Sequence, residues 1–262
     1  MKQSKRRWLA VWPLSGLIGL VCTFAAPATA VAGPASVIYS PIVDYREWEL
    51  ELKGGMFNWG HGDDGERAAK LAFGYGLAPR WGIEVEAEYS QTPGNVAHVE
   101  EYEFENIFQL TEHGEHWLDA GIFVEFEHNR LENVNTLVLG PMFQKETAHT
   151  QTNLNIHWVR RLSALPRDDS DDDEAGSRNE LQYQVQWKYN LGPRFQPGMQ
   201  VFGSLGSPGH LHSQELSVGP AFFGVTRLGS GRKLRYDVAL LGGLTHDTPD
   251  TTIRFQLEYE FF

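Results

Sequence analysis

Residues 81–89 read Trp-Gly-Ile-Glu-Val-Glu-Ala-Glu-Tyr, and this stretch decides the fold class. Apolar side chains alternate with glutamates at a period of two, which is the period at which a β-strand turns its side chains to opposite faces. Comparable segments of roughly ten residues recur along the chain, and they are weakest near 136–145, 197–202 and 216–225, where Gly and Pro interrupt the pattern. The sequence therefore predicts an all-β protein of about twelve amphipathic strands.

The length of these segments favours a transmembrane antiparallel up-and-down barrel. Roughly ten residues cross a bilayer at the tilt of a barrel strand, and lipid excludes any sheet with an open edge. An even strand count places both ends of the barrel on one side, the periplasm. The short turns predicted on that side are 78–80, 111–116, 146–148, 190–194 and 229–231. The connections predicted on the outer side are 58–66, 90–97, 129–132, 162–179, 203–214 and 245–250.

A soluble β-sandwich or lipocalin-like barrel would show the same alternation, with its apolar face turned inward. Two features favour the membrane: the polar face is dense in charge, and aromatic residues gather near the predicted strand ends, as in interfacial girdles. The aromatic residues in question are Trp48, Trp81, Tyr89, Tyr102, Trp158, Tyr189 and Tyr259.

The first thirty residues predict export. A basic start (Lys2, Lys5, Arg6, Arg7) precedes an apolar run to about residue 25 and small residues at Ala28-Thr29-Ala30, with Ala32 as the next cleavage candidate. This order is typical of a secretory signal peptide, although a single membrane anchor is the alternative. We therefore expect a signal peptide over 1–30 and one outer-membrane barrel domain over 31–262. The only cysteine, Cys22, lies in the leader, so we expect no disulfide in the mature chain.

The charge balance excludes some partners. Four of the 22 basic residues lie in the leader, so residues 31–262 hold 18 basic and 34 acidic side chains, a net charge of −16. A nucleic-acid partner would require a basic face. Strong acidity instead suits a surface or channel that meets cations.

The inward-facing charges are the main candidate for a functional site. The carboxylates of the polar phase fall on the first five strands, and basic residues fall on the last two, which close beside the first. We expect an acidic wall facing a smaller basic sector, as in a cation-preferring pore, and packed carboxylates favour a wet lumen over a plugged one. The residues predicted to line the pore are Glu49, Glu51, Glu84, Glu86, Glu88, Glu101, Glu103, Glu105, Glu125, Arg235 and Arg254; Asp119, Glu127 and Lys233 share their phase. Among these, Glu84, Glu86, Glu103 and Glu105, opposed by Arg235 and Arg254, are expected to form the constriction.

The C-terminal stretch Ile253-Arg-Phe-Gln-Leu-Glu-Tyr-Glu-Phe-Phe262 resembles the terminal strand by which bacterial outer-membrane barrels are recognised for assembly, except that its phase closes on Phe261. More broadly, the chain resembles a loosely defined family of proteobacterial outer-membrane barrels described as channels or as proteins associated with phenol degradation. The resemblance rests on 45–52, 104–112, 218–224 and the terminal strand. It implies passage of small solutes, and the expected partners are outer-membrane lipid and lipopolysaccharide, the barrel-assembly machinery and those solutes.

Two other groups of residues give weaker predictions of a metal site and of a catalytic site. The acidic run 168–174 approaches calcium-loop spacing, with Asp169, Asp171, Asp173 and Glu180, but Glu174 occupies the position that needs glycine. His210, His212 and Ser213 suggest a lipid hydrolase, yet His212 and Ser213 are adjacent and would face opposite ways on a strand. We therefore expect no catalytic residue, metal or cofactor. A lipid-hydrolysing enzyme and a non-conducting barrel whose loop 162–179 meets partners stay as alternatives to the channel.

Overall fold

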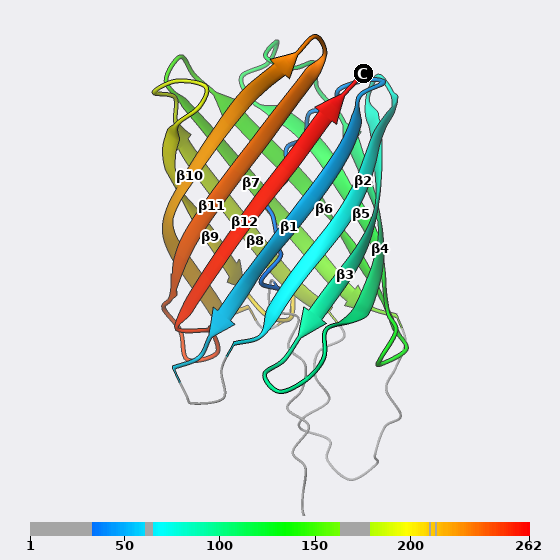
Figure 1. The fold of residues 1–262 in the computed structure, drawn as a ribbon, viewed down its shortest axis with the longest axis vertical. Helices are drawn as coiled ribbons and strands as arrows, with labels where there is room; N and C mark the ends of the chain where they lie inside the picture. Colours follow the sequence, from blue (N-terminus) through cyan, green and yellow to red (C-terminus); the bar gives the residue numbers. More distant parts are fainter. Residues whose placement is uncertain (1–32, 61–64, 163–178, 210, 213) are drawn as a thin grey trace, which may run out of the picture.

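The computed structural model describes residues 33–60, 65–162, 179–209, 211–212 and 214–262. Twelve antiparallel strands pair in chain order, and the first pairs with the last, so the sheet closes into a barrel (Figure 1). The strands are β1 (Trp48–Asn58), β2 (Arg67–Ala78), β3 (Trp81–Gln91), β4 (His98–Gln109), β5 (Asp119–Asn129), β6 (Val134–Glu146), β7 (Thr150–Arg161), β8 (Asn179–Tyr189), β9 (Gln196–Ser204), β10 (Glu215–Gly229), β11 (Arg232–Gly243) and β12 (Thr251–Phe261). The predicted fold class and strand number are confirmed.

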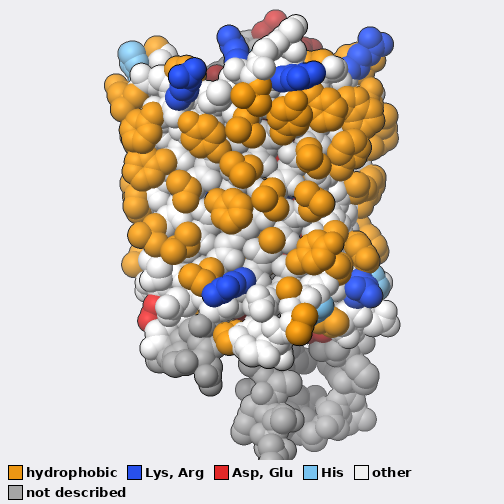
Figure 2. All heavy atoms as spheres, in the orientation of Figure 1, with side chains coloured by type: hydrophobic (Ala, Val, Ile, Leu, Met, Phe, Trp, Pro, Cys, Tyr) orange, Lys and Arg blue, Asp and Glu red, His pale blue; other side chains and the backbone are white. Residues whose placement is uncertain are grey.

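The alternation in the sequence sorts side chains between the two faces of the wall. On β3, Val85 is 51% exposed while its neighbour Glu86 is 4% exposed. The outer face carries a continuous apolar band between two rims that hold most of the visible lysines and arginines (Figure 2). A closed wall that is apolar outside and charged inside has the distribution of a barrel that sits in lipid.

The register at the closing seam follows from this sorting. Leu50 and Leu52 of β1 lie opposite Tyr259 and Leu257 of β12, so apolar side chains meet on the outer face. Slipping the pairing by one residue would turn these side chains into the barrel, because the side-chain period of a strand is two. β12 ends at Phe261, and Phe262 lies beyond it, as the phase of the terminal stretch predicts.

The connections divide the barrel into two ends. We call the end that carries the C-terminus the turn end, because the connections there are short, and the opposite end the loop end (Figure 1). Both sets of connections lie within a few residues of their predicted positions. Within the described residues, no helix has the length and apolar character needed to cross a membrane.

One segment departs from the expected plan. Residues 33–47, which we call the inner segment, run through the interior of the barrel from the loop end to the turn end, where β1 begins (Figure 1). The backbone of Pro34 lies against Gly55 near the loop end, and that of Asp44 against Gly76 near the turn end. The even strand count therefore places the two ends of the barrel wall together, but the chain before β1 crosses the lumen once more.

Candidate functional site

The carboxylates predicted to face inward lie inside the barrel, concentrated on β3, β4 and β5. Five glutamate pairs stand directly opposite one another across neighbouring strands: Glu84 and Glu105, Glu86 and Glu103, Glu88 and Glu101, Glu103 and Glu127, and Glu105 and Glu125. Like charges opposed across a ladder destabilise a sheet. The arrangement therefore requires cations or protons within the lumen.

Lys53 of β1 supplies one cation. Its Nζ lies 2.6 Å from Glu86 Oε1, 2.7 Å from Glu84 Oε1 and 3.3 Å from Glu51 Oε2. The lysine is 1% exposed, so its ammonium is shielded from bulk water, while Glu51 and Glu84 also line a cavity of the lumen. A buried charge needs partners of this kind, because desolvation costs several kcal/mol per ion.

Lys70 of β2 supplies a second cation towards the loop end. Its Nζ lies 2.6 Å from Glu103 Oε2 and 3.5 Å from Glu88 Oε2. The other oxygen of Glu103, Oε1, is buried without a hydrogen-bond partner among the described residues. Two lysines therefore face a larger number of carboxylates, so the part of the lumen lined by β3, β4 and β5 stays acidic.

Arg235 and Arg254, which were predicted to face the acidic wall, form ion pairs with acids of their own. Arg235 Nε lies against Glu260 and 3.6 Å from Glu258 Oε1, and Arg254 Nη1 lies 3.5 Å from Asp237 Oδ1. Each arginine thus has its own acids on β11 and β12. The neighbours of the acidic wall are Lys53 and Lys70, whose inward phase was visible in the sequence but whose role as partners was not predicted.

The opposite half of the lumen is lined by amides. Asn153 of β7 donates to Gln144 Oε1 of β6 at 2.8 Å, and Gln200 of β9 donates to Gln186 Oε1 of β8 at 2.9 Å. Neutral amides can pair with one another across strands in either direction, because each carries both donors and acceptors. These amide pairs carry no charge, although Arg254 of β12 also donates to Gln200 Oε1 and Glu180 of β8 accepts from Ser204 Oγ.

The inner segment lies between these two halves, and Tyr39 is its central contact. The Tyr39 hydroxyl donates to Glu105 Oε1 at 2.6 Å on the acidic side, and its ring stacks on Phe123 at 4.4 Å. On the amide side, Asn153 Nδ2 donates to Tyr39 O at 3.4 Å. Asn155, in the amide orientation that satisfies its neighbours, accepts from Tyr39 N at 2.8 Å.

Glycines on the inward face make room for the inner segment. A Cβ at Gly76 would overlap Asp44 O, and one at Gly121 would lie 2.9 Å from Pro41 Cβ. The segment thus packs directly on the backbone of the wall at positions where a larger side chain would displace it. Neither the inner segment nor Tyr39 was predicted as part of the site, although these inward glycines are a signal in the sequence.

Two cavities lie in the lumen on either side of Tyr39, which lines both. The loop-end cavity measures about 250 Å³, and the turn-end cavity about 80 Å³. The charged residues that line the loop-end cavity are Lys70, Glu100, Glu101, Glu125, Glu127, Glu132 and Arg161; those of the turn-end cavity are Asp44, Glu49, Glu51, Glu84 and Glu105. Carboxylates thus outnumber cations in the lining of each.

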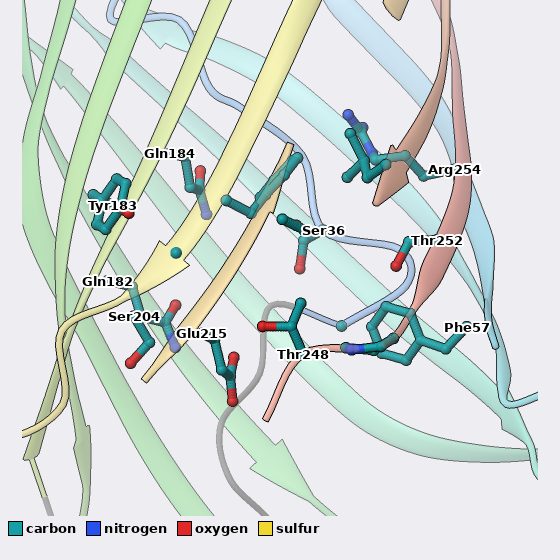
Figure 3. Close-up of a pocket in the computed structure, with 16 residues that line it drawn as sticks. Ser36, Phe57, Gln182, Tyr183, Gln184, Ser204, Glu215, Thr248, Thr252 and Arg254 are labelled. Atoms are coloured by element: carbon teal, nitrogen blue, oxygen red, sulfur yellow. The ribbon is translucent and has the colours of Figure 1, made fainter. Parts of the chain in front are cut away.

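A third cavity, of about 30 Å³, lies at the loop end between Ser36, Thr252 and Arg254 (Figure 3). Nε and Nη2 of Arg254 are buried without a hydrogen-bond partner among the described residues. A space of this size holds about two waters at roughly 10–15 Å³ each, and waters satisfy orphaned donors of this kind. The third cavity therefore has room for waters that would accept from these two nitrogens.

The constellations that suggested other chemistry fall mostly outside the described residues. His210, Ser213 and the acidic run 168–174 lie there, so the hydrolase and calcium hypotheses stay untested. Glu180, the last residue of the calcium spacing, hydrogen-bonds with Ser204 Oγ instead. The signal peptide over 1–30 also lies outside and stays a prediction.

The fold resembles that of known outer-membrane channels. No family model matches the sequence, and neither does any curated protein. The chain is similar to the solved structure of the NanC porin (TM-score 0.54, 11% identity, covering 81% of this chain and 99% of that one) and of the KdgM porin in complex with disordered oligogalacturonate (0.52, 9%, 82% and 98%). It is also similar to the COG4313 outer-membrane channel from Pseudomonas putida F1 (0.53, 12%, 84% and 96%). These likenesses establish the fold of an outer-membrane β-barrel.

Proposed function

We propose that this protein is a passive outer-membrane channel for small cationic or neutral solutes, which cross through the acidic half of the lumen. The observation that carries the proposal is the pair of carboxylate-lined cavities that follow one another along the barrel and meet at Tyr39. Rings of carboxylates raise the local concentration of cations and lower the barrier to their passage.

The residues proposed to line the path fall into two groups. Glu101 and Glu125, with Glu127, act at the loop end, where Glu103 holds Lys70, and Glu49, Glu51, Glu84 and Glu105 act near the turn end. Glu86, Glu88, Arg235 and Arg254 tune the field through their ion pairs. The same fold in three outer-membrane channels supports this function, while the association with phenol degradation stays a prediction of the resemblance alone.

Planar-bilayer recording tests the proposal. The purified barrel should give discrete conductance steps, and a KCl gradient should give a reversal potential on the cation-selective side. Replacing Glu101 and Glu127 by Gln should move the reversal potential towards zero, because both line the loop-end cavity.

The matched control is Glu112→Gln, which removes one charge from an exposed turn-end residue paired with Arg80. This variant should keep the wild-type selectivity. An absence of conductance steps, or a preference for anions, would overturn the channel proposal and leave the non-conducting barrel as the alternative.

A further inference from the structure

We infer that Tyr39 is the specificity-determining residue of this channel: held across the lumen by the inner segment, it sets the size of solute that passes between the two cavities. The inference rests on the proposed function. It assigns the narrow point to the chain before β1, whereas the sequence placed it among the charged residues of the wall.

The Tyr39 ring lies at the boundary between the two cavities. Tyr39 lines both the cavity of about 250 Å³ and the cavity of about 80 Å³. It spans from the amide half, where its backbone meets Asn153 and Asn155, to the acidic half, where its hydroxyl meets Glu105. A solute that leaves one cavity for the other must therefore pass this side chain.

The Tyr39 ring is held in place by contacts on several sides. It packs on Phe123, which is fully buried and itself stacks on His157 at 4.9 Å. The ammonium of Lys53 lies 5.5 Å from the centroid of the Tyr39 ring, within the range of a cation–π interaction. With the hydroxyl bonded to Glu105, movement of the ring would break contacts on several sides at once.

The inner segment is also anchored beyond Tyr39. Ser40 Oγ donates to Gln144 Oε1 at 2.9 Å, and Val43 N donates to Gln109 Oε1 at 2.8 Å. At the turn end, Arg46 N donates to Gly76 O at 2.9 Å. These contacts fix the segment to β6, β4 and β2, so the position of Tyr39 is a property of the folded barrel.

The chemistry of the site defines the solutes that it admits. A phenol ring beside a carboxylate offers an apolar face and acidic oxygens, which suits small cations and neutral molecules with hydrogen-bond donors. Anions are repelled by Glu105 and by the carboxylates around Lys53. We therefore expect the ring to set the size limit and the carboxylates to set the charge preference, as two separable properties.

The experiment compares single-channel conductance and liposome swelling with neutral sugars of increasing size for four proteins. Tyr39→Ala should raise conductance at least about two-fold and admit larger sugars, because the narrowest section of a pore limits passage. Tyr39→Phe keeps the ring and should keep the wild-type size limit. The control Tyr89→Ala makes the same truncation on the outer face, where Tyr89 is 45% exposed, and should leave both readings unchanged.

A second variant keeps Tyr39 and moves its support. Gly76→Ala places a Cβ where Asp44 O now lies, so it should displace the turn end of the inner segment and also raise conductance. Its control is Gly242→Ala, where the nearest atom would be 4.0 Å away. Heat-modifiable migration on a gel verifies that each variant is a folded barrel.

The outcomes separate this inference from the channel proposal. If the wild type conducts and Tyr39→Ala matches it in conductance and size limit, the inference is overturned while the channel survives. A wild type that is silent while Tyr39→Ala conducts overturns both, because the inner segment then closes the barrel and Tyr39 sets no size limit for passage. Silence of every variant overturns both.

Discussion

Lys53→Met provides the sharpest test of how dry the acidic cluster is. The substitution keeps an unbranched side chain of similar length but removes the ammonium that lies within 3.3 Å of Glu51, Glu84 and Glu86. The three carboxylates, each less than 10% exposed, would then lie close together with no cation between them. Removing one partner of a buried ion pair destabilises a protein by about 3–5 kcal/mol, because the remaining charge is uncompensated.

The matched comparison is Arg80→Gln at the turn end. Arg80 pairs with Glu112, and the two side chains are 48% and 55% exposed. An exposed ion pair contributes about 0.2–1 kcal/mol, so this variant should unfold close to the wild type. The structure thus predicts that the two variants, which each remove one positive charge, differ clearly in their free energy of unfolding.

The assay is equilibrium unfolding in detergent or lipid vesicles, followed by tryptophan fluorescence and by the heat-modifiable gel shift. Adding Glu86→Gln to Lys53→Met should recover part of the loss, because it removes one of the repelling carboxylates; the coupling is read from a double-mutant cycle. If Lys53→Met costs no more than Arg80→Gln, the cluster is hydrated and the reasoning from burial is refuted.

Two further perturbations probe the inner segment and its end. Burial, together with the neighbouring Glu260, raises the pKa of Glu47 to about 8 from 4.5. The folded barrel therefore holds this proton more tightly than the unfolded chain does, and its stability falls as pH rises between these two values. Glu47→Gln should flatten the pH dependence of the unfolding midpoint over pH 5–8, and an unchanged slope would contradict the assignment. Phe123→Ala should cost about 3–5 kcal/mol of unfolding free energy, and it should also raise conductance by loosening Tyr39. Phe126→Ala on the lipid face of β5, where Phe126 is 44% exposed, is its control, and equal effects of the two on conductance would argue against the stack.

The strands could be predicted from the sequence because each one carries its own evidence. In Glu84, Val85 and Glu86, the identity of each residue reports which face it occupies, and the wall is held by neighbours that are close in the sequence. Turns such as 79–80 follow from the breaks between segments. The closure of β1 on β12 was inferred from the requirement that lipid leaves no strand edge unpaired.

The inner segment could not be predicted in the same way. Residues 33–47 form no helix or strand, so no period marks them, and the contacts that fix them to the wall are with residues distant in the chain, such as Glu105 and Gln144. Their trace in the sequence is indirect: Gly76 and Gly121 occupy inward positions on β2 and β5 where a Cβ would meet the inner segment. Glycines in the polar phase of a barrel strand are therefore a sign of a chain packed on the inside of the wall.

The ion pairs could not be predicted either, because they depend on how far each side chain extends across several strands. Sequence phase alone placed Lys53 and Lys70 on the inner face, but not within contact of Glu86 and Glu103, which lie on β3 and β4. Lys53 reaches from β1 past β2 to Glu84 and Glu86 on β3.

The same geometry bears on how the acidic sector is balanced. Lys53 and Lys70 are both committed to carboxylates by contacts of 2.6 Å, yet Glu125 and Glu127 line the loop-end cavity beyond them. Opposed glutamates such as Glu105 and Glu125 would repel strongly if dry, since like charges across a ladder destabilise the sheet. A cavity of about 250 Å³ beside them admits water and mobile cations, which relieve that repulsion without further basic residues. The surplus of carboxylates is thus tolerable only where the lumen is wet, and the loop-end cavity, with Tyr39 at its inner limit, is where the structure provides that room.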